Sequence, residues 1–332
     1  MEVSPLGRSG LKVSRGCLGT MTFGNTEWGT DEDESQRIVD AFLDAGNNFI
    51  DTADVYNAGR SEEIVGRCIA KRRSEVVLAT KGYNAMGGGP NDRGSSRAHL
   101  TRALEDSLRR LGTDYVDLYQ LHNWDHDTPI DESIATLDTF VRSGKVRYVG
   151  CSNFYASQLV EAQWAAERGA AATLVSLQPQ YSLIWRDIER DILPTAIRHG
   201  MGVIVWSPLG GGMLTGKYTK GSDLPDDGRL SRGTGMEAEG MRALTFSDRN
   251  FEIVAEVEKV AEQLGTTATS VSLAWLLGRP GVTSVIIGPR TIDQLQQNLA
   301  GFDLDLPLES AKALSRGSRL PVSYPWYMQL RL

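Results

Sequence analysis

The sequence predicts an α/β fold, a (β/α)8 TIM barrel that opens with a β-hairpin and carries long loops at the C-terminal ends of its strands. Three observations predict it along the 332 residues: strand-like runs alternate with amphipathic helical patterns, these runs number eight, and most of them are continuously apolar. Continuous apolar runs are typical of parallel strands buried on both faces. An open doubly wound sheet is the alternative that this pattern leaves open. Because no linker or change of composition divides the chain, we expect residues 1–332 to form a single domain.

The expected elements follow in order from the N-terminus. Residues 3–6 and 11–13 form a hairpin around a turn at residues 7–10, and amphipathic helices include "DESQRIVDAFLDAG" and "SRAHLTRALEDSLRRLG", which end at Gly46 and Gly112. The stretch 221–240 is too polar and glycine-rich for a core element, so we expect a long functional loop or lid there. The barrel strands are expected at residues 16–20, 48–51, 76–80, 115–120, 146–151, 174–178, 202–206 and 282–287.

Composition narrows the classes of function. The net charge of −7 argues against a nucleic-acid-binding surface. No run of about 18 apolar residues predicts a membrane span, and the N-terminus lacks the apolar region of a secretory signal. The three cysteines, Cys17, Cys68 and Cys151, have no C-x-x-C spacing. We therefore expect no metal site, no disulfide framework, and a cytoplasmic location.

Four ionisable side chains fall at neighbouring strand ends. Asp51 ends the second barrel strand, Lys81 follows the third and His122 follows the fourth, while Tyr56 lies in the loop after Asp51. Each has a plainer interpretation on its own, as a helix cap, a pocket wall or a solvated charge. Because barrel active sites lie at the C-terminal ends of the strands, the four can converge. Asp51 would then balance Lys81, Lys81 would lower the pKa of Tyr56 so that it donates a proton near neutral pH, and His122 would orient a carbonyl or share the proton.

Glycine-rich stretches suggest a phosphate-bearing ligand. No G-x-G-x-x-G occurs, and the P-loop-like "GGMLTGKY" has Tyr218 where a Ser or Thr should hold Mg²⁺, which argues against an NTPase. The glycines at 210–212 with Lys217 still suit a loop that closes over a pyrophosphate. In "IIGPRTIDQLQQN", Arg290 precedes a helix N-terminus, which suits a phosphate. A Schiff base on Lys81, as in barrel aldolases, is an alternative chemistry.

Several motifs occur in an order that resembles the aldo-keto reductase family over nearly the whole chain. They are "FIDTADVYNAGRSEEIVG", "LATKGY", "LYQLHNWD", "VRYVGCSNF", "SLQPQYSL", "VIVWSPLGGGMLTGKY" and "IIGPRTIDQLQQN". Within the family the chain looks closer to the microbial and potassium-channel-β-subunit branches than to the short mammalian aldose reductases. The resemblance implies that Tyr56 is the general acid, helped by Asp51, Lys81 and His122.

The resemblance also implies NADP(H) as the cofactor. Ser152, Asn153 and Gln178 would hold the nicotinamide carboxamide, Trp206 would stack on the ring, and Arg290 would favour NADP over NAD through the 2′-phosphate. The family often has Glu where Gln297 stands, so that contact can differ. The full set of implied cofactor contacts is Thr20, Met21, Asp51, Ser152, Asn153, Gln178, Trp206, Ser207, Pro208, Leu209, Gly211, Lys217, Arg229, Gly288, Arg290, Gln294, Gln297 and Asn298.

The function expected from this set is NADPH-dependent reduction of an aldehyde or ketone to an alcohol, with no membrane or nucleic-acid partner. The expected substrate contacts are Tyr56, His122, Trp28, Tyr83 and Trp124, and the C-terminal "SYPWYMQLRL" offers further aromatic walls. Such walls suit a medium-sized carbonyl, a keto-sugar or a natural-product intermediate. Broad aldehyde detoxification, and an NADPH-binding regulatory subunit that docks on another protein, are the alternatives. A homo-oligomer is compatible with either.

Overall fold

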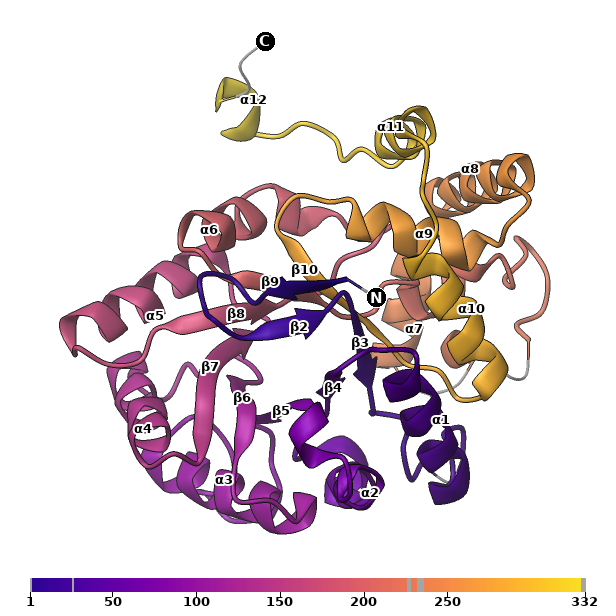
Figure 1. Cartoon of the computed structure of the whole chain (residues 1–332). Helices are drawn as coiled ribbons and strands as arrows, with labels where there is room; N and C mark the ends of the chain where they lie inside the picture. The colour runs from indigo at the N-terminus through magenta and orange to yellow at the C-terminus, as the bar shows by residue number, and fades with distance from the viewer. Residues whose placement is uncertain (1, 26, 226–227, 232–235, 330–332) are drawn as a thin grey trace.

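Eight parallel strands close into a barrel at the centre of the molecule (Figure 1). The computed structural model describes residues 2–25, 27–225, 228–231 and 236–329. The strand order around the barrel is β10-β3-β4-β5-β6-β7-β8-β9, and every pairing is parallel. This confirms the predicted (β/α)8 barrel. The strands are β3 (Gly16–Gly19), β4 (Phe49–Asp51), β5 (Val77–Gly82), β6 (Val116–Leu121), β7 (Val146–Ser152), β8 (Leu174–Gln178), β9 (Gly202–Val205) and β10 (Val282–Ile287).

The predicted N-terminal hairpin closes one end of the barrel. Its strands, β1 (Val3–Pro5) and β2 (Lys12–Ser14), are antiparallel. Leu6 and Val13 are fully buried and pack with barrel residues that include Phe49 and Leu118. The hairpin turn also approaches the backbone before β9 closely. A Cβ at Gly7 would lie only 2.4 Å from the carbonyl oxygen of Gly200, so only glycine fits there. The hairpin thus fills the end of the barrel at which the strands begin, and leaves the opposite end for a site.

Helices surround the strands and pack on their outer faces. Their starts follow local rules: Asp31, Ser96, Ser247, Thr267 and Thr291 each accept a hydrogen bond from the backbone of the following first turn. These helices include α1 (Glu32–Asp44), α2 (Arg60–Ile69), α3 (Arg97–Leu111), α4 (Ile130–Arg142), α5 (Ala156–Arg168), α6 (Ile192–Arg198), α8 (Asp248–Leu264), α9 (Ala268–Leu277), α10 (Ile292–Phe302) and α11 (Leu308–Gly317).

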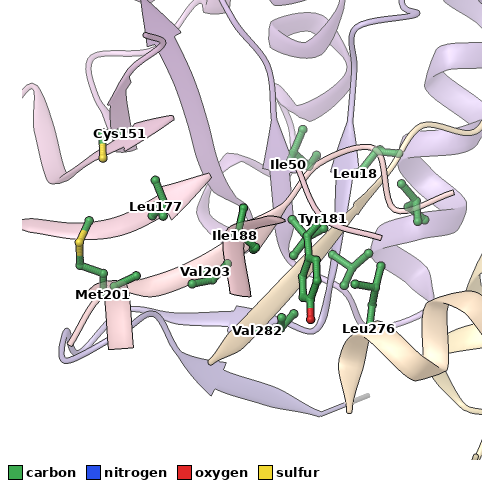
Figure 2. Packing of buried hydrophobic residues seen from close by; sticks show 14 of the residues in the cluster. Leu18, Ile50, Cys151, Leu177, Tyr181, Ile188, Met201, Val203, Leu276 and Val282 are labelled. Carbon is green, nitrogen blue, oxygen red and sulfur yellow. The ribbon is translucent and has the colours of Figure 1, made fainter. Parts of the chain in front are cut away.

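The main core lies between the strands and this helical layer. Figure 2 shows Leu177 and Val203 on neighbouring strands, with Tyr181, Ile188 and Leu276 packed beside them. All five side chains are almost completely buried. Burial of apolar surface on this scale is the main driving force for a barrel. The rigid layer beneath the strand ends therefore holds the loops above it in fixed positions.

The stretch 221–240, expected to be a loop, contains regular structure. A short 3-10 helix, η5 (Arg229–Ser231), and the start of helix α7 (Met236–Thr245) lie within it, while residues 226–227 and 232–235 fall outside the described residues. The expectation was wrong for α7 because "MEAEGMRALT" is rich in Met, Glu, Ala and Leu, which favour helix despite Gly240.

The C-terminal segment extends away from the barrel and ends in the short helix α12 (Trp326–Gln329) (Figure 1). Arg190 holds this segment through hydrogen bonds to Ser323 and to the carbonyl of Pro321. Its described side chains include exposed aromatic rings at Tyr324 and Tyr327. Across the described part of the chain, no helix has both the length and the apolar character needed to span a bilayer.

Candidate active site

A buried lysine stands at the end of β5, where the barrel opens. Lys81 Nζ lies 2.6 Å from Asp51 Oδ2 and also donates to the carbonyl of Thr52 at 2.8 Å and to Tyr56 Oη at 3.2 Å. Its side chain is 0% exposed. An ammonium group has three N–H donors, and each has an acceptor here. The buried charge is therefore paired and hydrogen-bonded, which is the condition for placing a charge in a protein interior.

The other oxygen of Asp51 is held from two further strands. Oδ1 accepts from Gln178 Nε2 at 2.8 Å and from Gln120 Nε2 at 3.3 Å. Burial lowers the pKa of Lys81, but the charge of Asp51 and the hydrogen bonds to Asp51 and Tyr56 outweigh burial and raise that pKa above its ordinary value. Lys81 thus stays protonated. A protonated amine is not a nucleophile, so this geometry does not favour the Schiff-base alternative.

Tyr56 begins the short 3-10 helix η1 (Tyr56–Gly59) in the loop after β4. Asn57 and Ala58, which follow it, have left-handed φ values of 50° and 53°. The Asn57 amide donates to the carbonyls of Met21 (3.0 Å) and Phe23 (2.7 Å), which ties this turn to the loop after β3. The turn therefore presents the phenol of Tyr56 to Lys81 from a strained but well-anchored backbone.

The pKa of Tyr56 differs from expectation. Burial raises the pKa of Tyr56 above its ordinary value of 10.0, and the opposing charge of Lys81 does not compensate, in part because Asp51 raises it further. Lys81 lowers this pKa in the expected direction, but the net fall expected from the sequence does not occur, because sequence spacing shows the partner and not the depth of burial. Tyr56 consequently holds its proton at neutral pH and is available as a proton donor.

His122 follows β6 and completes the predicted set of four. Its ring meets the ring of Tyr56 edge-on, with centroids 5.9 Å apart. Burial and then the charge of Lys81 lower the pKa of His122 to about 3, so the imidazole is neutral. The structure thus brings Asp51, Tyr56, Lys81 and His122 together at the mouth of the barrel.

A cavity of about 700 Å³ opens above these residues. All eighteen residues expected to contact a cofactor line it, together with Tyr56, His122 and Trp28. Lys81 is not in the lining because it is fully buried beneath Tyr56 and Asp51. Tyr83 and Trp124 also lie outside the lining, and Trp124 packs instead on Phe154 with ring centroids 5.1 Å apart. Their contact with a substrate stays a prediction.

The chemistry of the wall fits an anionic nicotinamide dinucleotide. Lys217, Arg229 and Arg290 bring three cations to the lining, whereas the single carboxylate among its described residues, Asp51, is paired with Lys81. A Cβ at Gly288 would meet nothing within 4 Å, so this part of the wall leaves open space beside the backbone. Cations and close backbone approach are what binding of a pyrophosphate and a further phosphate requires.

Polar side chains at the ends of β7 and β8 are held in place by one another. Ser152 Oγ donates to the carbonyl of Gln178 at 2.8 Å. Asn153 accepts at Oδ1 from Trp206 Nε1 at 3.1 Å and donates from Nδ2 to the carbonyl of His122 at 3.1 Å. The indole of Trp206 is therefore fixed at the edge of the cavity, as a ring that stacks on a ligand would need to be.

The start of α10 differs from the expected phosphate site. Two of its backbone N–H groups are already engaged: Ile292 donates to Glu34 at 3.1 Å and Gln294 donates to the Thr291 side chain at 3.2 Å. Arg290 donates to the carbonyl of Trp28 at 3.3 Å. A phosphate at this position would therefore be bound mainly by side chains, above all Arg290, rather than by the N–H groups of the helix start.

Seven further residues line the cavity without having been expected from the sequence. The pattern Thr267-x-x-Ser270 marks the start of α9, and so could have indicated Thr267, but it does not reveal which way the helix end faces. No described residue of the C-terminal segment lines this cavity, so the aromatic walls expected from that segment stay a prediction. Nor do the described residues hold any group of three or more His, Cys, Asp or Glu that could bind a metal ion. The seven are Gly19, Thr22, Thr215, Thr267, Thr269, Ile286 and Ile287, while Gly212 belongs to the glycine loop expected over a pyrophosphate.

Comparisons with known proteins show the family of this chain. The family model described as "Aldo/keto reductase family" matches residues 17–316. An uncharacterised oxidoreductase of Bacillus subtilis, YrpG, is 42% identical over 98% of this chain and all of its own length. A probable voltage-gated potassium channel subunit beta of Arabidopsis thaliana is 36% identical over 98% of both chains, and the versiconal hemiacetal acetate reductase of Aspergillus parasiticus is 34% identical over 95% of this chain and 96% of its own. The chain therefore belongs to the aldo/keto reductase family, oxidoreductases that reduce carbonyl groups with a nicotinamide cofactor.

Proposed function

We propose that the protein reduces an aldehyde or ketone to an alcohol with NADPH, and that Tyr56 is the acid. One observation carries the proposal: a protonated phenol lines the cavity with its oxygen 3.2 Å from a buried lysine ammonium. A bound nicotinamide would supply hydride to the carbonyl carbon. Tyr56 would then give its proton to the carbonyl oxygen as negative charge develops there.

The other three residues would support this transfer. The charge of Lys81 would stabilise the phenolate that Tyr56 becomes, an electrostatic effect that is strong in a site with little water. Asp51 would hold Lys81 in place through the 2.6 Å ion pair. His122, being neutral, would offer a hydrogen bond to the substrate oxygen rather than a charge.

The preference for NADPH is the finer part of the proposal. Arg290 would bind the 2′-phosphate, with Lys217 and Arg229 near the pyrophosphate and Ser152, Asn153 and Gln178 at the carboxamide. Because the first N–H of α10 already donates to Glu34, the guanidinium would carry most of the 2′-phosphate affinity. We expect Arg290→Met to raise the KM for NADPH about 10- to 100-fold, since charge-assisted hydrogen bonds contribute about 1.5–3 kcal/mol each. The KM for NADH should change little.

The substrate would be a medium-sized carbonyl compound. Trp28 at the rim gives the cavity an aromatic wall, and a relative that is 34% identical bears the name versiconal hemiacetal acetate reductase. Both favour a keto-sugar or a natural-product intermediate over the smallest aldehydes. A preference for small aldehydes in a substrate panel would instead favour broad detoxification.

The test is NADPH oxidation by the purified protein across a panel of aldehydes, ketones and nucleotide-linked keto-sugars. NADH and the Tyr56→Phe variant run in parallel. Tyr56→Phe should lower kcat by at least about 10²-fold while leaving NADPH binding intact, because a general acid contributes about 10²–10⁴-fold. Turnover that survives in this variant would contradict the assignment of the acid.

A second candidate is an NADPH-binding subunit that docks on another protein. The name of the Arabidopsis relative, which is 36% identical, favours it. The four polar residues at the barrel mouth argue for turnover instead. Tight NADPH binding with no turnover on any panel member, together with stable co-purification of a partner, would favour the docking subunit.

A further inference from the structure

Asn84 lies two residues beyond the end of β5 and reaches the ring of His122. Its amide nitrogen, Nδ2, is 3.1 Å from His122 Nδ1. An amide nitrogen can only donate a hydrogen bond, so the imidazole nitrogen opposite it must accept. A neutral histidine carries one proton, and in this arrangement that proton is on Nε2.

The other groups around His122 do not select its tautomer, so the contact with Asn84 decides it. The backbone of His122 is fixed on both sides, because its N–H donates to the carbonyl of Gly82 at 3.2 Å and its own carbonyl accepts from Asn153. The ring faces Tyr56 edge-on and feels the charge of Lys81, which together with burial keeps it neutral. Neutrality alone does not select a tautomer, and the contact with Asn84 is the one ring hydrogen bond that the described residues make.

We propose that Asn84 is a positioning residue that holds His122 in the Nε2–H tautomer, so that the histidine presents a donor to the oxygen of the carbonyl substrate. The tautomer itself is a property of the protein alone, whereas its effect on rate rests on the proposed function. With Nδ1–H instead, Nε2 would direct a lone pair at the substrate oxygen, and the two lone pairs would repel. The tautomer would thus decide whether His122 assists Tyr56 or opposes it.

The chain offers a sharp variant because Asn84→Asp changes hydrogen bonding with almost no change in shape. A carboxylate only accepts, so it would draw the proton to Nδ1 and leave Nε2 as an acceptor. Asn84→Ala removes the contact and would let both tautomers form. Asn91→Asp makes the same substitution at an exposed position in the same loop, away from His122, and controls for the added charge.

The first readout is ¹⁵N NMR of histidine-labelled protein without cofactor or substrate. The chain has four histidines, so the His122 signals can be assigned by their loss in His122→Asn. In the native protein and in Asn91→Asp we expect Nε2 to show the shift of a protonated nitrogen and Nδ1 that of an unprotonated one. In Asn84→Asp the two shifts should exchange. A native protein with Nδ1 protonated, or an unchanged spectrum in Asn84→Asp, would overturn the proposal.

The second readout is steady-state reduction of the best panel substrate. Asn84→Asp should lower kcat/KM for the carbonyl about 10²-fold, the usual effect of removing one donor to a developing oxyanion. Asn84→Ala should lose less, and NADPH binding should stay unchanged in both. A tautomer that exchanges in Asn84→Asp without any loss of kcat/KM would overturn the catalytic consequence. If the native protein reduces no carbonyl, the proposed function fails while the NMR result still decides the tautomer.

Discussion

Charged groups are buried on both faces of strand β5, but the two faces differ in how completely these groups are hydrogen-bonded. Side chains alternate along a strand, so Lys81 points into the barrel mouth while its neighbour Thr80 points outward to Glu62 of helix α2. On the inner face, each N–H of Lys81 and both oxygens of Asp51 have partners. On the outer face, Glu62 pairs with Arg110 at 2.7 Å.

Asp54 belongs to the outer cluster, which we define as Asp54, Glu62, Thr80 and Arg110, and it is the member that lacks hydrogen-bond partners in the part of the chain that the structure describes. It is fully buried, and among the described residues neither carboxyl oxygen has a hydrogen-bond partner. Burial, and then the nearby charge of Glu62, raise the pKa of Asp54 to about 7, against weaker opposing effects of the adjacent Val55 backbone N–H, Arg110 and Lys81. Lys81, whose hydrogen-bond partners are complete, therefore stays charged in the interior. Asp54, whose partners are not, is instead protonated and neutral up to about pH 7.

The largest effect is expected from a substitution in the inner cluster, which consists of Asp51, Tyr56 and Lys81. Lys81→Met should leave the carboxylate of Asp51 buried without its cation, which costs about 3–5 kcal/mol of unfolding free energy. Carbonyl reduction should fall below detection, because Tyr56 loses the charge that stabilises its phenolate. Denaturant unfolding and NADPH oxidation measure the two effects.

The matched control removes both charges. Lys81→Met with Asp51→Asn should recover most of the lost stability but none of the activity, because no unpaired charge remains in the interior. If the single and double variants were equally stable, the buried ion pair would not be the source of the loss.

The next effect concerns the outer cluster and depends on pH. Folded protein keeps the proton of Asp54 up to about pH 7, whereas the unfolded chain releases it near its ordinary value of 3.8. The unfolded state binds fewer protons between these values, so native stability should fall as pH rises from about 4 to 7. Since one pKa unit corresponds to about 1.4 kcal/mol, Asp54→Asn should be more stable than the native protein at pH 8 by up to about 4 kcal/mol.

This comparison can be checked by unfolding at pH 5 and pH 8. The difference between Asp54→Asn and the native protein should be larger at pH 8. Turnover should be retained, because Asp54 lies behind the site rather than in it. Equal differences at both pH values would mean that Asp54 is ionised in the folded protein.

The inner cluster was predictable from the sequence to a degree that the outer one was not. Barrel topology places the ends of neighbouring strands together, so Asp51, Lys81 and His122 could be assembled from strand order alone. Gln178 was expected at the cofactor, but its hydrogen bond to Asp51 was not, nor was that of Gln120, because nothing local marks the direction of either side chain. Asp54 lies in the same motif as Tyr56, yet its role depends on burial.

Other features depended on tertiary context in the same way. The pKa of Tyr56 was expected to fall because its cationic partner could be recognised, whereas the desolvation that outweighs that partner could not. The contact of Asn84 with His122 depends on how the loop after β5 turns. Helix α7 was not expected, because the glycines and polar residues around it hide the helix propensity of its Met, Glu, Ala and Leu residues.

A smaller effect weakens the outer cluster without removing a charge. Thr80 Oγ1 donates to Glu62 Oε1 at 2.5 Å, and both side chains are fully buried. Thr80→Val keeps the shape but removes the donor, so unfolding free energy should fall by about 1–3 kcal/mol. Thr80→Ser keeps the hydroxyl and should lose less. Unchanged carbonyl reduction in Thr80→Val would show that the two faces of β5 act independently, whereas a large loss would show coupling through the strand.

The smallest effect concerns the backbone that presents Tyr56. Ala58 and Ala170 are both exposed alanines with left-handed φ values, 53° and 47°, but only Ala58 lies beside the site. A left-handed backbone costs an alanine about 1–2 kcal/mol, and replacement by glycine removes that strain. Glycine also has more freedom in the unfolded chain, which offsets about 0.5–1 kcal/mol of this gain. Ala58→Gly and Ala170→Gly should therefore each stabilise the protein slightly, by about 0.5 kcal/mol, as read from thermal or denaturant unfolding.

Only the variant near the site should alter catalysis. If the strained turn holds the phenol against Lys81, Ala58→Gly should lower kcat while Ala170→Gly leaves it unchanged, since relaxing the backbone lets Tyr56 move away from its partner. Equal kcat values in the two variants would show that the hydrogen bonds from Asn57 to Met21 and Phe23 are enough to fix Tyr56. The left-handed alanine would then be a tolerated cost of the loop rather than a part of the site.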